Sequence, residues 1–411
     1  MENKEDALRF FKGVICGVIL TSVLIVTKNG YDAKHAVFKE NNMDIGEKAS
    51  IIASMLEQNY IGDFEKNGLA DQMYCGMANA MGDPYTVYMN EEQMQNFITE
   101  ANGSLCGVGI IISSDKNNDT CIISDVLKNS PAEKAGLKAG DKIISVDGNN
   151  ISGLSVSDIS ALTKGKNNTK IVISIYRDGL GEKSFEITRS MIDMQYVKGE
   201  KDGNIGYIQI TEFSKITASQ FENELSKLMK QGIKGLIIDL RNNPGGMVDV
   251  VTEIADKLLP EGIITYTVDK NGNRVDFKSE KGCIDIPIAV LVNSGSASAS
   301  ELLAGALQDN KKGVIIGTQT YGKGIVQGLY SLSDGSGLKI TIQKYFTPNG
   351  VCIQGCGITP DYKIDSDDCS ASANDKQYNK AVEILNDKIK DWYNMIDVAL
   401  LGTGGMMPMP E

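Results

Sequence analysis

Small hydroxyl and methyl side chains cluster at residues 293–301, Asn-Ser-Gly-Ser-Ala-Ser-Ala-Ser-Glu. The apolar run at 287–292 that leads into the cluster is typical of a buried strand, and 302–307 has helical spacing. The cluster therefore lies at a predicted strand-to-helix turn. Backbone N–H groups are free at the start of a helix, so such a turn can hold an anion or an oxyanion.

A second stretch, Tyr-Gly-Lys-Gly-Ile-Val-Gln at 321–327, places one lysine between two glycines. The only histidine is His35, so nothing after it can supply a Ser-His-Asp triad or a His-Glu-x-x-His zinc site. If a serine is nucleophilic, its proton must go to Lys, Asp, Glu or Tyr. Lys323 is the candidate, provided that burial or a nearby cation lowers its pKa from about 10.4. From residue types alone, a tightly packed turn and a solvated loop lysine remain the alternative.

Three motifs, in the right order, resemble those of the carboxyl-terminal processing proteases, also called tail-specific proteases. They are Ser-Ala-Ser-Ala-Ser-Glu (296–301), Tyr-Gly-Lys-Gly-x-Val-Gln (321–327) and Asp-Leu-Arg-Asn-Asn-Pro-Gly-Gly (239–246). The similarity covers nearly the whole chain after residue 45. It implies that Ser298 is the nucleophile, Lys323 the base and Gln327 the residue that positions the lysine amine. We expect no cofactor and no metal.

The stretch 242–246 follows a predicted strand, and the family motif implies that a glycine here donates to the oxyanion. Pro244 has no N–H, so Gly245 is the first candidate and Gly246 the next. The N–H of Ala299, directly after the nucleophile, is the expected second donor.

Three charged residues of these motifs are expected to be structural. Asp239 and Arg241 are two residues apart and are predicted to pair and hold the turn. Glu301 is predicted to satisfy local N–H groups or a cation at the start of the helix, rather than to act as a base.

Residues 103–190 resemble a PDZ domain. The expected elements are strands at 106–112, 121–126 and 170–176 and helices within 130–137 and 156–162. In PDZ domains successive N–H groups of a glycine-containing loop hold a C-terminal carboxylate while the peptide adds as a strand. Here that role falls on Gly107, Val108, Gly109 and Ile110. The implied partners are proteins with apolar C-termini, although a PDZ domain alone indicates binding and not cleavage.

After residue 200, strands and helices alternate, which predicts a parallel or mixed sheet with helices on its faces. The three site motifs fall at the carboxyl ends of strands, where such sheets hold ligands. The expected fold class is multidomain α/β, with an N-terminal membrane anchor, a helical segment, a PDZ β-domain and an α/β (crotonase-like) serine protease core. The expected boundaries are 1–30 for the anchor, 44–100 for the helical region, 103–190 for the PDZ domain, 191–365 for the core and 366–411 for a C-terminal helix and tail.

Residues 13–27 are uncharged and apolar, and about 22 Å long as a helix, shorter than a bilayer core of about 30 Å. Adding the phenylalanines at 10–11 brings the length near 27 Å, enough for a thin span. Lys4, Arg9 and Lys12 precede it, which favours a cytoplasmic N-terminus. We expect a single-pass signal anchor in the cell membrane with the catalytic part outside the cytoplasm. A cleaved signal peptide and a secreted protein are the alternative.

Charge and cysteine content limit the partners. The net charge of −12 offers no basic stripe to nucleic acid. The eight cysteines show no paired Cys-x-x-Cys metal signature. Disulfides between Cys106 and Cys121, or between Cys352 and Cys356, and free thiols both stay open.

Residues 44–100 are predicted to be helical, with apolar stripes and a break at 82–88, Gly-Asp-Pro-Tyr-Thr-Val-Tyr. This region contributes to dimerisation in some members of the family, which raises a homodimer as an option. The resemblance as a whole implies an exported serine endopeptidase. The alternatives are a catalytically silent PDZ scaffold that binds C-termini and a non-proteolytic enzyme of the crotonase type.

Overall fold

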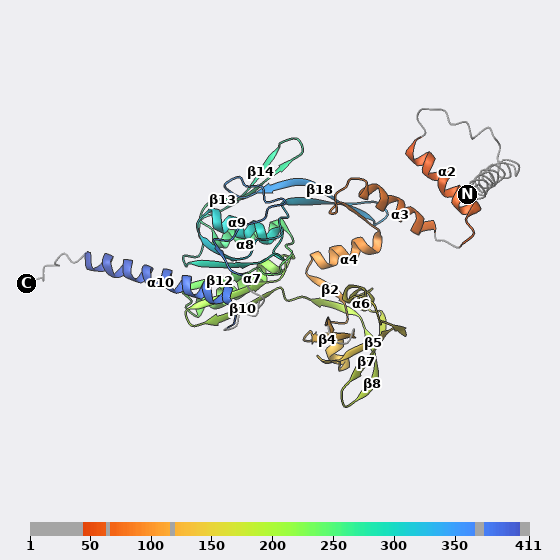
Figure 1. Ribbon diagram of the computed structural model, residues 1–411, viewed down its shortest axis with the longest axis horizontal. Helices are drawn as coiled ribbons and strands as arrows, with labels where there is room; N and C mark the ends of the chain where they lie inside the picture. Colours follow the sequence, from red (N-terminus) through yellow and green to blue (C-terminus); the bar gives the residue numbers. More distant parts are fainter. Residues whose placement is uncertain (1–43, 63–65, 116–119, 366–373, 403–411) are drawn as a thin grey trace, which may run out of the picture. The chain divides into compact units, whose positions relative to one another are not determined.

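The structure is a computed structural model in which the chain forms two compact units, Met1–Ala70 and Asp71–Glu411 (Figure 1). It describes residues 44–62, 66–115, 120–365 and 374–402. The predicted signal anchor at 1–30 lies outside these ranges. Within them, no helix is long and apolar enough to cross a bilayer.

A six-stranded sheet forms the centre of the larger unit. Its strands, in spatial order, are β10 (Val197–Asp202), β11 (Ile205–Ile210), β12 (Gly235–Asp239), β15 (Ile288–Val292), β16 (Gly313–Gly317) and β19 (Tyr362–Lys363). The first strand is antiparallel to its neighbour and the others are parallel. Every residue of β12 and β15 is buried, as expected for parallel strands covered on both faces. The predicted alternation of strands and helices is confirmed.

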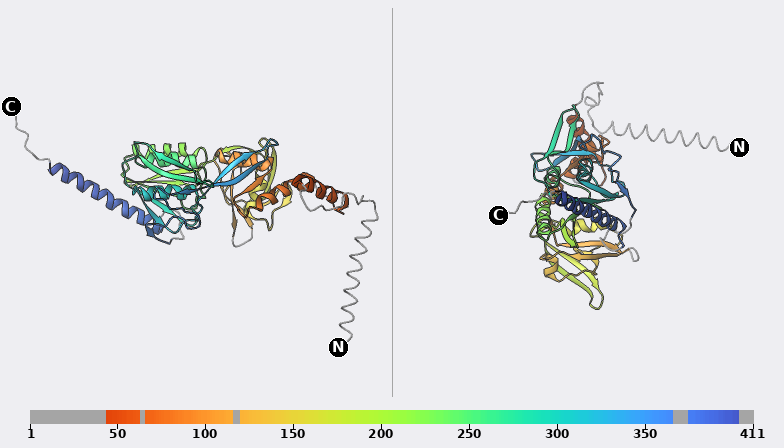
Figure 2. Two further views of the ribbon diagram at one scale, coloured as in Figure 1. Left: turned by 90° about the horizontal axis from the view of Figure 1, so that it is seen from above. Right: turned by 90° about the vertical axis from the view of Figure 1, so that its left-hand side faces the viewer.

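Helices cover both faces of this sheet. They are α7 (Thr217–Lys230), α8 (Val248–Leu258) and α9 (Ala299–Asp309) on one face and α10 (Lys376–Gly402), blue in Figure 2, on the other. Successive residues of β12 divide between the two cores. Leu236 and Ile238 pack with α7, α8 and α9, whereas Ile237 packs with Leu385 of α10. This division follows from the two-residue period of a strand.

A second sheet lies over the site motifs. Its strands are β1 (Val87–Met89), β18 (Gly337–Phe346), β13 (Gly262–Asp269) and β14 (Arg274–Ser279) in order, with β17 (Ile325–Ser331) also paired to β18. Strand β1 pairs with β18 in antiparallel register, Val87 opposite Lys339. The predicted break of the helical region at 82–88 is confirmed, and the break leads the chain into the catalytic part.

The PDZ sheet has the order β3 (Ile110–Asp115), β4 (Thr120–Val126), β5 (Lys142–Val146), β7 (Lys170–Arg177) and β8 (Gly181–Thr188). The remaining elements here are β6 (Asn149–Asn150), which pairs with β5, α5 (Pro131–Ala135), α6 (Val156–Thr163), and the pair β2 (Ser104–Gly107) and β9 (Ser190–Asp193). The strand expected at 106–112 is split in two. Residues 108–109 leave β2 and turn into β3, because Gly109 adopts a φ of 85°.

The N-terminal helices are α2 (Ile45–Asn59), α3 (Lys66–Asn79) and α4 (Glu91–Ala101). Helix α2 begins at an Asp44 cap, whose carboxylate accepts a hydrogen bond from the Gly46 N–H. It buries none of its residues, although Ile51, Ile52 and Met55 line it. Its apolar side chains therefore have no partner within the described part of the chain.

The described cysteines are free thiols. Cys106 lies in β2, which pairs with β9, and Cys121 lies in β4, which pairs with β3 and β5. The two are therefore not on neighbouring strands, and a disulfide between them is not formed. Cys352 and Cys356 are also unbridged, and the Cys356 thiol donates to the Cys352 carbonyl at 3.2 Å.

Candidate active site

Ser298 stands directly before α9, with a φ of 55° and a ψ of −116°. This left-handed backbone is strained for a residue other than glycine. It occurs where β15 ends and the chain turns sharply into the helix. Such a turn presents the side chain at the carboxyl edge of the sheet, as in nucleophile elbows.

Two neighbouring serines have structural roles instead. The Ser296 hydroxyl donates to the Leu240 carbonyl at 2.8 Å, and the Ser300 hydroxyl donates to the Asn243 carbonyl at 2.9 Å. Both side chains are fully buried, whereas Ser298 keeps 9% exposure. The outer serines fasten the turn to the loop after β12. The predicted nucleophile is therefore the serine that this fastening leaves accessible.

One buried carboxylate organises the turn and the lysine segment together. Glu301 is fully buried, and its Oε2 accepts from the N–H groups of Ser298 and Lys323, both at 2.8 Å. Its Oε1 accepts from the Thr320 hydroxyl at 2.5 Å and the Gly322 N–H at 2.6 Å. The prediction that Glu301 satisfies local N–H groups is confirmed, and the groups include that of the candidate base.

Lys323 is partly buried, and its ammonium makes no hydrogen bond or ion pair with a residue of the described ranges. The ring of Tyr85 lies beneath it, with Nζ 4.6 Å from the ring centroid. Burial, and then the positive charge of Lys339, hold the pKa of Lys323 below its usual value, although Asp83 and Glu301 oppose this. The environment thus shifts Lys323 towards the neutral amine that a general base requires.

Tyr345, on β18, links the two candidate catalytic residues. Its hydroxyl donates to the Lys323 carbonyl and is hydrogen-bonded to the Ser298 hydroxyl. Burial raises its pKa, so it stays protonated at neutral pH. The sequence analysis gave this tyrosine no role. Its only signal was a buried position on a strand of the catalytic region.

Gln327 lies on β17, four residues after Lys323, at a register shift between Val326 and Gln327. Its side-chain nitrogen is buried and has no hydrogen-bond partner in the described structure. A buried amide without a partner costs about 1–3 kcal/mol. A hydrogen bond to the Lys323 amine or to a bound substrate would remove this cost. The role of positioning the lysine amine remains a prediction for Gln327.

Gly245 packs directly on the nucleophile. A Cβ placed on it would lie 2.7 Å from the Ser298 Cβ and 2.9 Å from the Ala299 nitrogen. Its own N–H, however, donates to the Asn243 side-chain oxygen at 2.8 Å. In this conformation the first candidate for the oxyanion donor is therefore occupied.

The next residue is better placed to donate. The Gly245 carbonyl accepts from the Phe213 N–H at 2.9 Å. Because C=O and N–H point in opposite directions across a trans peptide, the Gly246 N–H is directed away from Phe213. Within the described residues, neither this N–H nor that of Ala299 has a partner. Both groups are therefore free to donate, and Ala299 directly follows Ser298.

Asp239 and Arg241 form a structural network, as predicted. Arg241 pairs with Asp239 at 2.5 Å and with Asp375 at 2.7 Å, and all three side chains are almost fully buried. The Tyr207 hydroxyl also donates to Asp239, at 2.8 Å. Buried and bonded to one another, these groups hold the end of β12.

The loop between β2 and β3 has the backbone of a carboxylate site. The carbonyls of Val108 and Gly109 face the domain, accepting from Ala132 N–H at 2.8 Å and Leu127 N–H at 3.0 Å. The N–H groups of Gly109 and Ile110, on the other side of the same two peptides, therefore face away. Two successive N–H groups directed outwards can bind an anion.

Strand β3 is the edge strand of the PDZ sheet, and α6 packs beside it. An edge strand next to a helix accepts an added peptide strand. Gly107 lies near the C-terminal end of α6, where a Cβ placed on it would be 3.6 Å from the Thr163 carbonyl oxygen. The four predicted peptide-binding residues are thus contiguous with a free strand edge.

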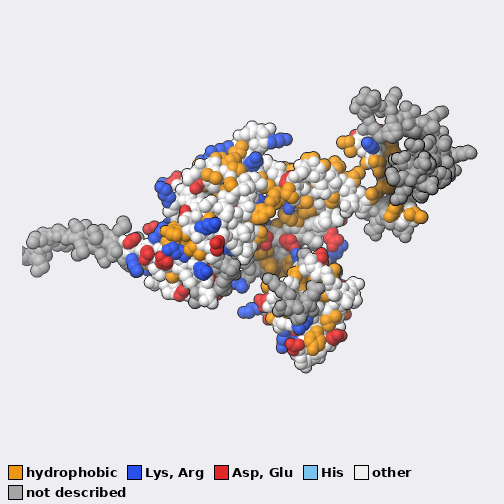
Figure 3. All heavy atoms as spheres, in the orientation of Figure 1, with side chains coloured by type: hydrophobic (Ala, Val, Ile, Leu, Met, Phe, Trp, Pro, Cys, Tyr) orange, Lys and Arg blue, Asp and Glu red, His pale blue; other side chains and the backbone are white. Residues whose placement is uncertain are grey.

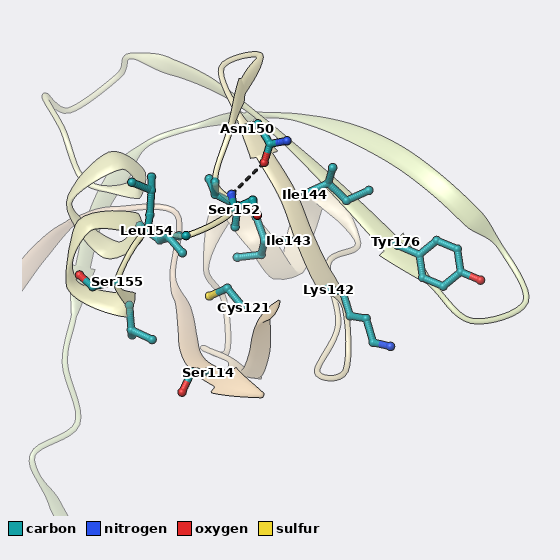
Figure 4. A pocket seen from close by; sticks show the side chains of 14 residues that line it. Ser114, Cys121, Lys142, Ile143, Ile144, Asn150, Ser152, Leu154, Ser155 and Tyr176 are labelled. Atoms are coloured by element: carbon teal, nitrogen blue, oxygen red, sulfur yellow. Dashed lines mark hydrogen bonds between the residues drawn. The ribbon is translucent and has the colours of Figure 1, made fainter. Parts of the chain in front are cut away.

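A separate cavity of about 690 Å³ opens at the N-terminal end of α6 (Figure 4). Leu154 and Ser155 line one side and Lys142 and Tyr176 the other, with Cys121 at its base. The residues at 107–110 do not line it, because they lie at the opposite end of β3. On the face of the described molecule drawn in Figure 3, acidic and basic side chains are interspersed, without a basic stripe.

Both the catalytic core and the smaller β-domain match known families. Residues 204–364 match the family described as peptidase family S41, and residues 122–177 match the PDZ domain. A carboxyl-terminal-processing protease of Synechocystis is 37% identical over 320 residues, covering 75% of each chain. The carboxy-terminal processing protease CtpA of Bacillus subtilis is 36% identical over 371 residues, covering 89% of this chain and 78% of that protein.

Among solved structures, one from Bacteroides fragilis, described as a candidate S41 protease, aligns with a TM-score of 0.55 and 18% identity. The alignment covers 85% of this chain and 99% of that one. At this identity the likeness concerns the fold, a PDZ domain joined to a mixed α/β core.

Proposed function

The chain belongs to peptidase family S41 and is a serine-type peptidase of the carboxyl-terminal processing kind, and from this premise we propose that Ser298 and Lys323 form its catalytic dyad. The observation that carries the proposal is the Glu301 carboxylate, which accepts from the N–H groups of both residues at 2.8 Å. A single buried group thereby fixes nucleophile and base in one frame. We propose further that the PDZ domain selects substrates by their C-termini.

Substrate capture uses the edge of β3. The C-terminal segment of a protein adds to this strand, and its carboxylate meets the outward N–H groups of Gly109 and Ile110, with Gly107 and Val108 shaping the loop. The unpaired edge supplies main-chain hydrogen bonds that do not depend on sequence. An apolar last side chain suits the apolar core beneath the loop, in which Val108 is buried.

Cleavage then follows acyl-transfer chemistry. The Ser298 oxygen attacks a peptide carbonyl while its proton passes to the neutral Lys323 amine, which Gln327 orients. The N–H groups of Ala299 and Gly246 stabilise the oxyanion. The Gly245 N–H joins them when its hydrogen bond to the Asn243 side-chain oxygen breaks. The C–N bond breaks, and the leaving amine takes the proton from Lys323. Water attacks the resulting ester, giving its proton to Lys323, and Ser298 is restored.

A catalytically silent PDZ scaffold is the second candidate, since the same fold would bind C-termini without cutting. The retained network around Ser298 and the absence of an ion pair on Lys323, among described groups, favour the enzyme. A non-proteolytic enzyme of the crotonase type is disfavoured by the match to family S41.

Digestion of an unfolded, carboxymethylated reporter protein that ends in three alanines tests the dyad. The full chain in detergent should cleave it, and Ser298→Ala and Lys323→Ala should each lower the rate at least about a thousandfold. Ser294→Ala, in the exposed part of the same turn, should cleave normally. Cleavage that survives either catalytic substitution would overturn the assignment. Binding of the reporter without cleavage by the parent chain would favour the scaffold.

The exposed apolar side of α2 supports a homodimer as part of the proposal. Ile51, Ile52, Met55 and Leu56 are each 40–49% exposed on a helix that buries nothing. A second copy of the same helix offers a complementary apolar face. Light scattering after size exclusion should give twice the chain mass, and Ile52→Glu should return it to the monomer.

Membrane attachment is proposed from the sequence of residues 13–27, outside the described ranges. The apolar run is long enough for a thin span if the preceding phenylalanines join it. The chain should stay in the membrane pellet through alkaline carbonate extraction. Its release into the supernatant, shortened at the N-terminus, would indicate signal-peptide cleavage instead.

A further inference from the structure

Tyr85 reaches the active site from the N-terminal helical region, more than two hundred residues before Lys323 in sequence. Its ring centroid lies 4.6 Å from Lys323 Nζ. We propose that Tyr85 is a positioning residue whose ring shields the Lys323 amine from water and so keeps this general base neutral. The inference rests on the proposed function, because it assigns a role beside the proposed dyad.

The turn that carries Tyr85 is fastened to the catalytic part. Asp83 Oδ1 accepts from the Tyr85 N–H at 3.0 Å, and Oδ2 accepts from the hydroxyls of Thr86 at 2.7 Å and Thr341 at 2.5 Å. The Thr341 N–H also donates to the Thr86 hydroxyl at 3.2 Å. Thr341 lies on β18, the strand that carries Tyr345. The turn that carries the ring is therefore anchored to the catalytic part.

The nearby carboxylates are engaged elsewhere. Both oxygens of Asp83 accept from Thr86, Thr341 and the Tyr85 N–H, and both oxygens of Glu301 accept from other donors. Among the described residues, the charged and titratable groups that face Lys323 are Asp83 and Tyr85 from the turn, Glu301 from α9, and Lys339 and Tyr345 from β18. Of these, the Tyr85 ring makes the close contact with the amine.

The ring has two opposing effects on Lys323. The face of an aromatic ring attracts an ammonium by about 0.5–2 kcal/mol, which favours the charged form. Exclusion of water favours the neutral form, because an ammonium loses its hydration. Burial is the largest cause of the lowered pKa of Lys323. The proposal requires that shielding outweighs attraction.

Tyr85 itself is not a competing acid or base. A hydrogen bond with Tyr321, together with burial, raises its pKa to about 12. The phenol is therefore neutral over the range in which the protease would work. The ring excludes water from the Lys323 amine by its bulk. Phenylalanine, which lacks the hydroxyl, should exclude water almost as well.

Trace acetylation of the full chain with acetic anhydride at a series of pH values tests the proposal without requiring turnover. Only neutral amines react, so mass spectrometry of the peptide that contains Lys323 gives the pH at which its labelling is half-maximal. In the parent chain this midpoint should lie below that of exposed lysines such as Lys281.

Three substitutions separate the two effects. Tyr85→Ala should move the midpoint upwards, and Tyr85→Phe should leave it near the parent value. Tyr85→Leu, which excludes water but has no aromatic face, should keep it at or below the parent value. A downward shift in both Ala and Leu variants would show that attraction dominates and would overturn the proposal, as would an unchanged midpoint in Tyr85→Ala. If Tyr85→Ala fails to fold, an upward shift in Tyr85→Leu overturns it equally.

Proteolysis provides the second readout. For Tyr85→Ala, kcat/KM on the reporter protein should fall about three- to tenfold at pH 7 and recover at higher pH, whereas a merely structural defect would lower it at every pH. Tyr362→Ala is the matched control, because Tyr362 lies 5.3 Å from Lys380 on the exposed surface. It should change neither readout. Survival of cleavage in Lys323→Ala would instead refute the dyad, a result distinguishable from any shift in labelling.

Discussion

The Glu301 carboxylate accepts four hydrogen bonds, two at each oxygen, and the donors come from two segments of the active site, the Ser298 turn and residues 320–323. Glu301→Gln would replace one oxygen with an NH2 group that faces N–H donors. Each buried donor left unsatisfied costs about 1–3 kcal/mol. We expect a lower melting temperature and a fall in kcat/KM of at least about a hundredfold, because the NH2 group deprives either Ser298 and Lys323, or Thr320 and Gly322, of their acceptor.

Glu261→Gln is the control for this substitution, since Glu261 is exposed and makes a long ion pair of 3.5 Å. It should change neither stability nor cleavage. Full activity in Glu301→Gln would show that the carboxylate serves the fold alone and does not position the dyad.

At the residue scale, motif resemblance pointed to Ser298 and Lys323 as the proposed dyad but not to the groups around them. The roles proposed for these two residues rest on short local motifs in the sequence. Tyr345 contacts these residues from β18, and Tyr85 does so from a turn far earlier in the chain. The residues next to each tyrosine in sequence do not indicate these contacts. The engagement of the Gly245 N–H by Asn243 likewise depends on side-chain direction, which sequence does not specify.

At the scale of elements, the loop before β3 depends on one backbone conformation. Gly109 has a φ of 85°, and a Cβ on it would lie 2.3 Å from the Ser130 Cβ. Gly109→Ala should therefore displace the outward N–H groups and weaken peptide binding at least about tenfold. Fluorescence anisotropy measures this with a labelled decapeptide ending in three alanines, in a full-chain Ser298→Ala background that prevents cleavage.

Gly148→Ala is the control that separates the effect of backbone strain from the effect of displacing the loop. Gly148 also has a positive φ, 79°, but a Cβ there would meet no atom within 4 Å. It should cost some stability through backbone strain and leave affinity unchanged. Equal losses of affinity in the two variants, or binding of the amidated peptide as tightly as the free acid, would contradict the assignment of the loop.

The regular elements were predictable where hydrophobic pattern decides them. The alternation of strands and helices after residue 200 was predicted, because buried strands such as β16 and amphipathic helices such as α7 have strong periodicity. The hairpin of β13 and β14 was not predicted, since β14 is mostly exposed and polar. Three-residue β1 was also missed, because its pairing with β18 is a long-range contact.

At the scale of the whole molecule, the last part of the chain supports the active site through the sheet. Asp375 caps the start of α10, accepting from the N–H groups of Gln377 at 3.0 Å and Tyr378 at 3.1 Å. The same carboxylate holds Arg241, at 2.7 Å, on the loop that leads to Gly245 and Gly246. The C-terminal helix is thus connected to the proposed oxyanion site by one buried ion pair.

Substitution of Asp375 should therefore reduce both stability and catalysis. Asp375→Ala removes a charged hydrogen bond and a helix cap, which together contribute about 2–4 kcal/mol. Asp375→Asn keeps a capping oxygen but not the charge, so its loss in urea-induced unfolding should be smaller. Lys380→Ala, which breaks a partly exposed ion pair on the same helix, should cost no more than about 1 kcal/mol. If the α10 connection positions the loop, kcat falls in Asp375→Ala while KM for the reporter is unchanged. A variant that is less stable yet cleaves at the parent rate would show that Asp239 alone suffices to hold Arg241 for catalysis.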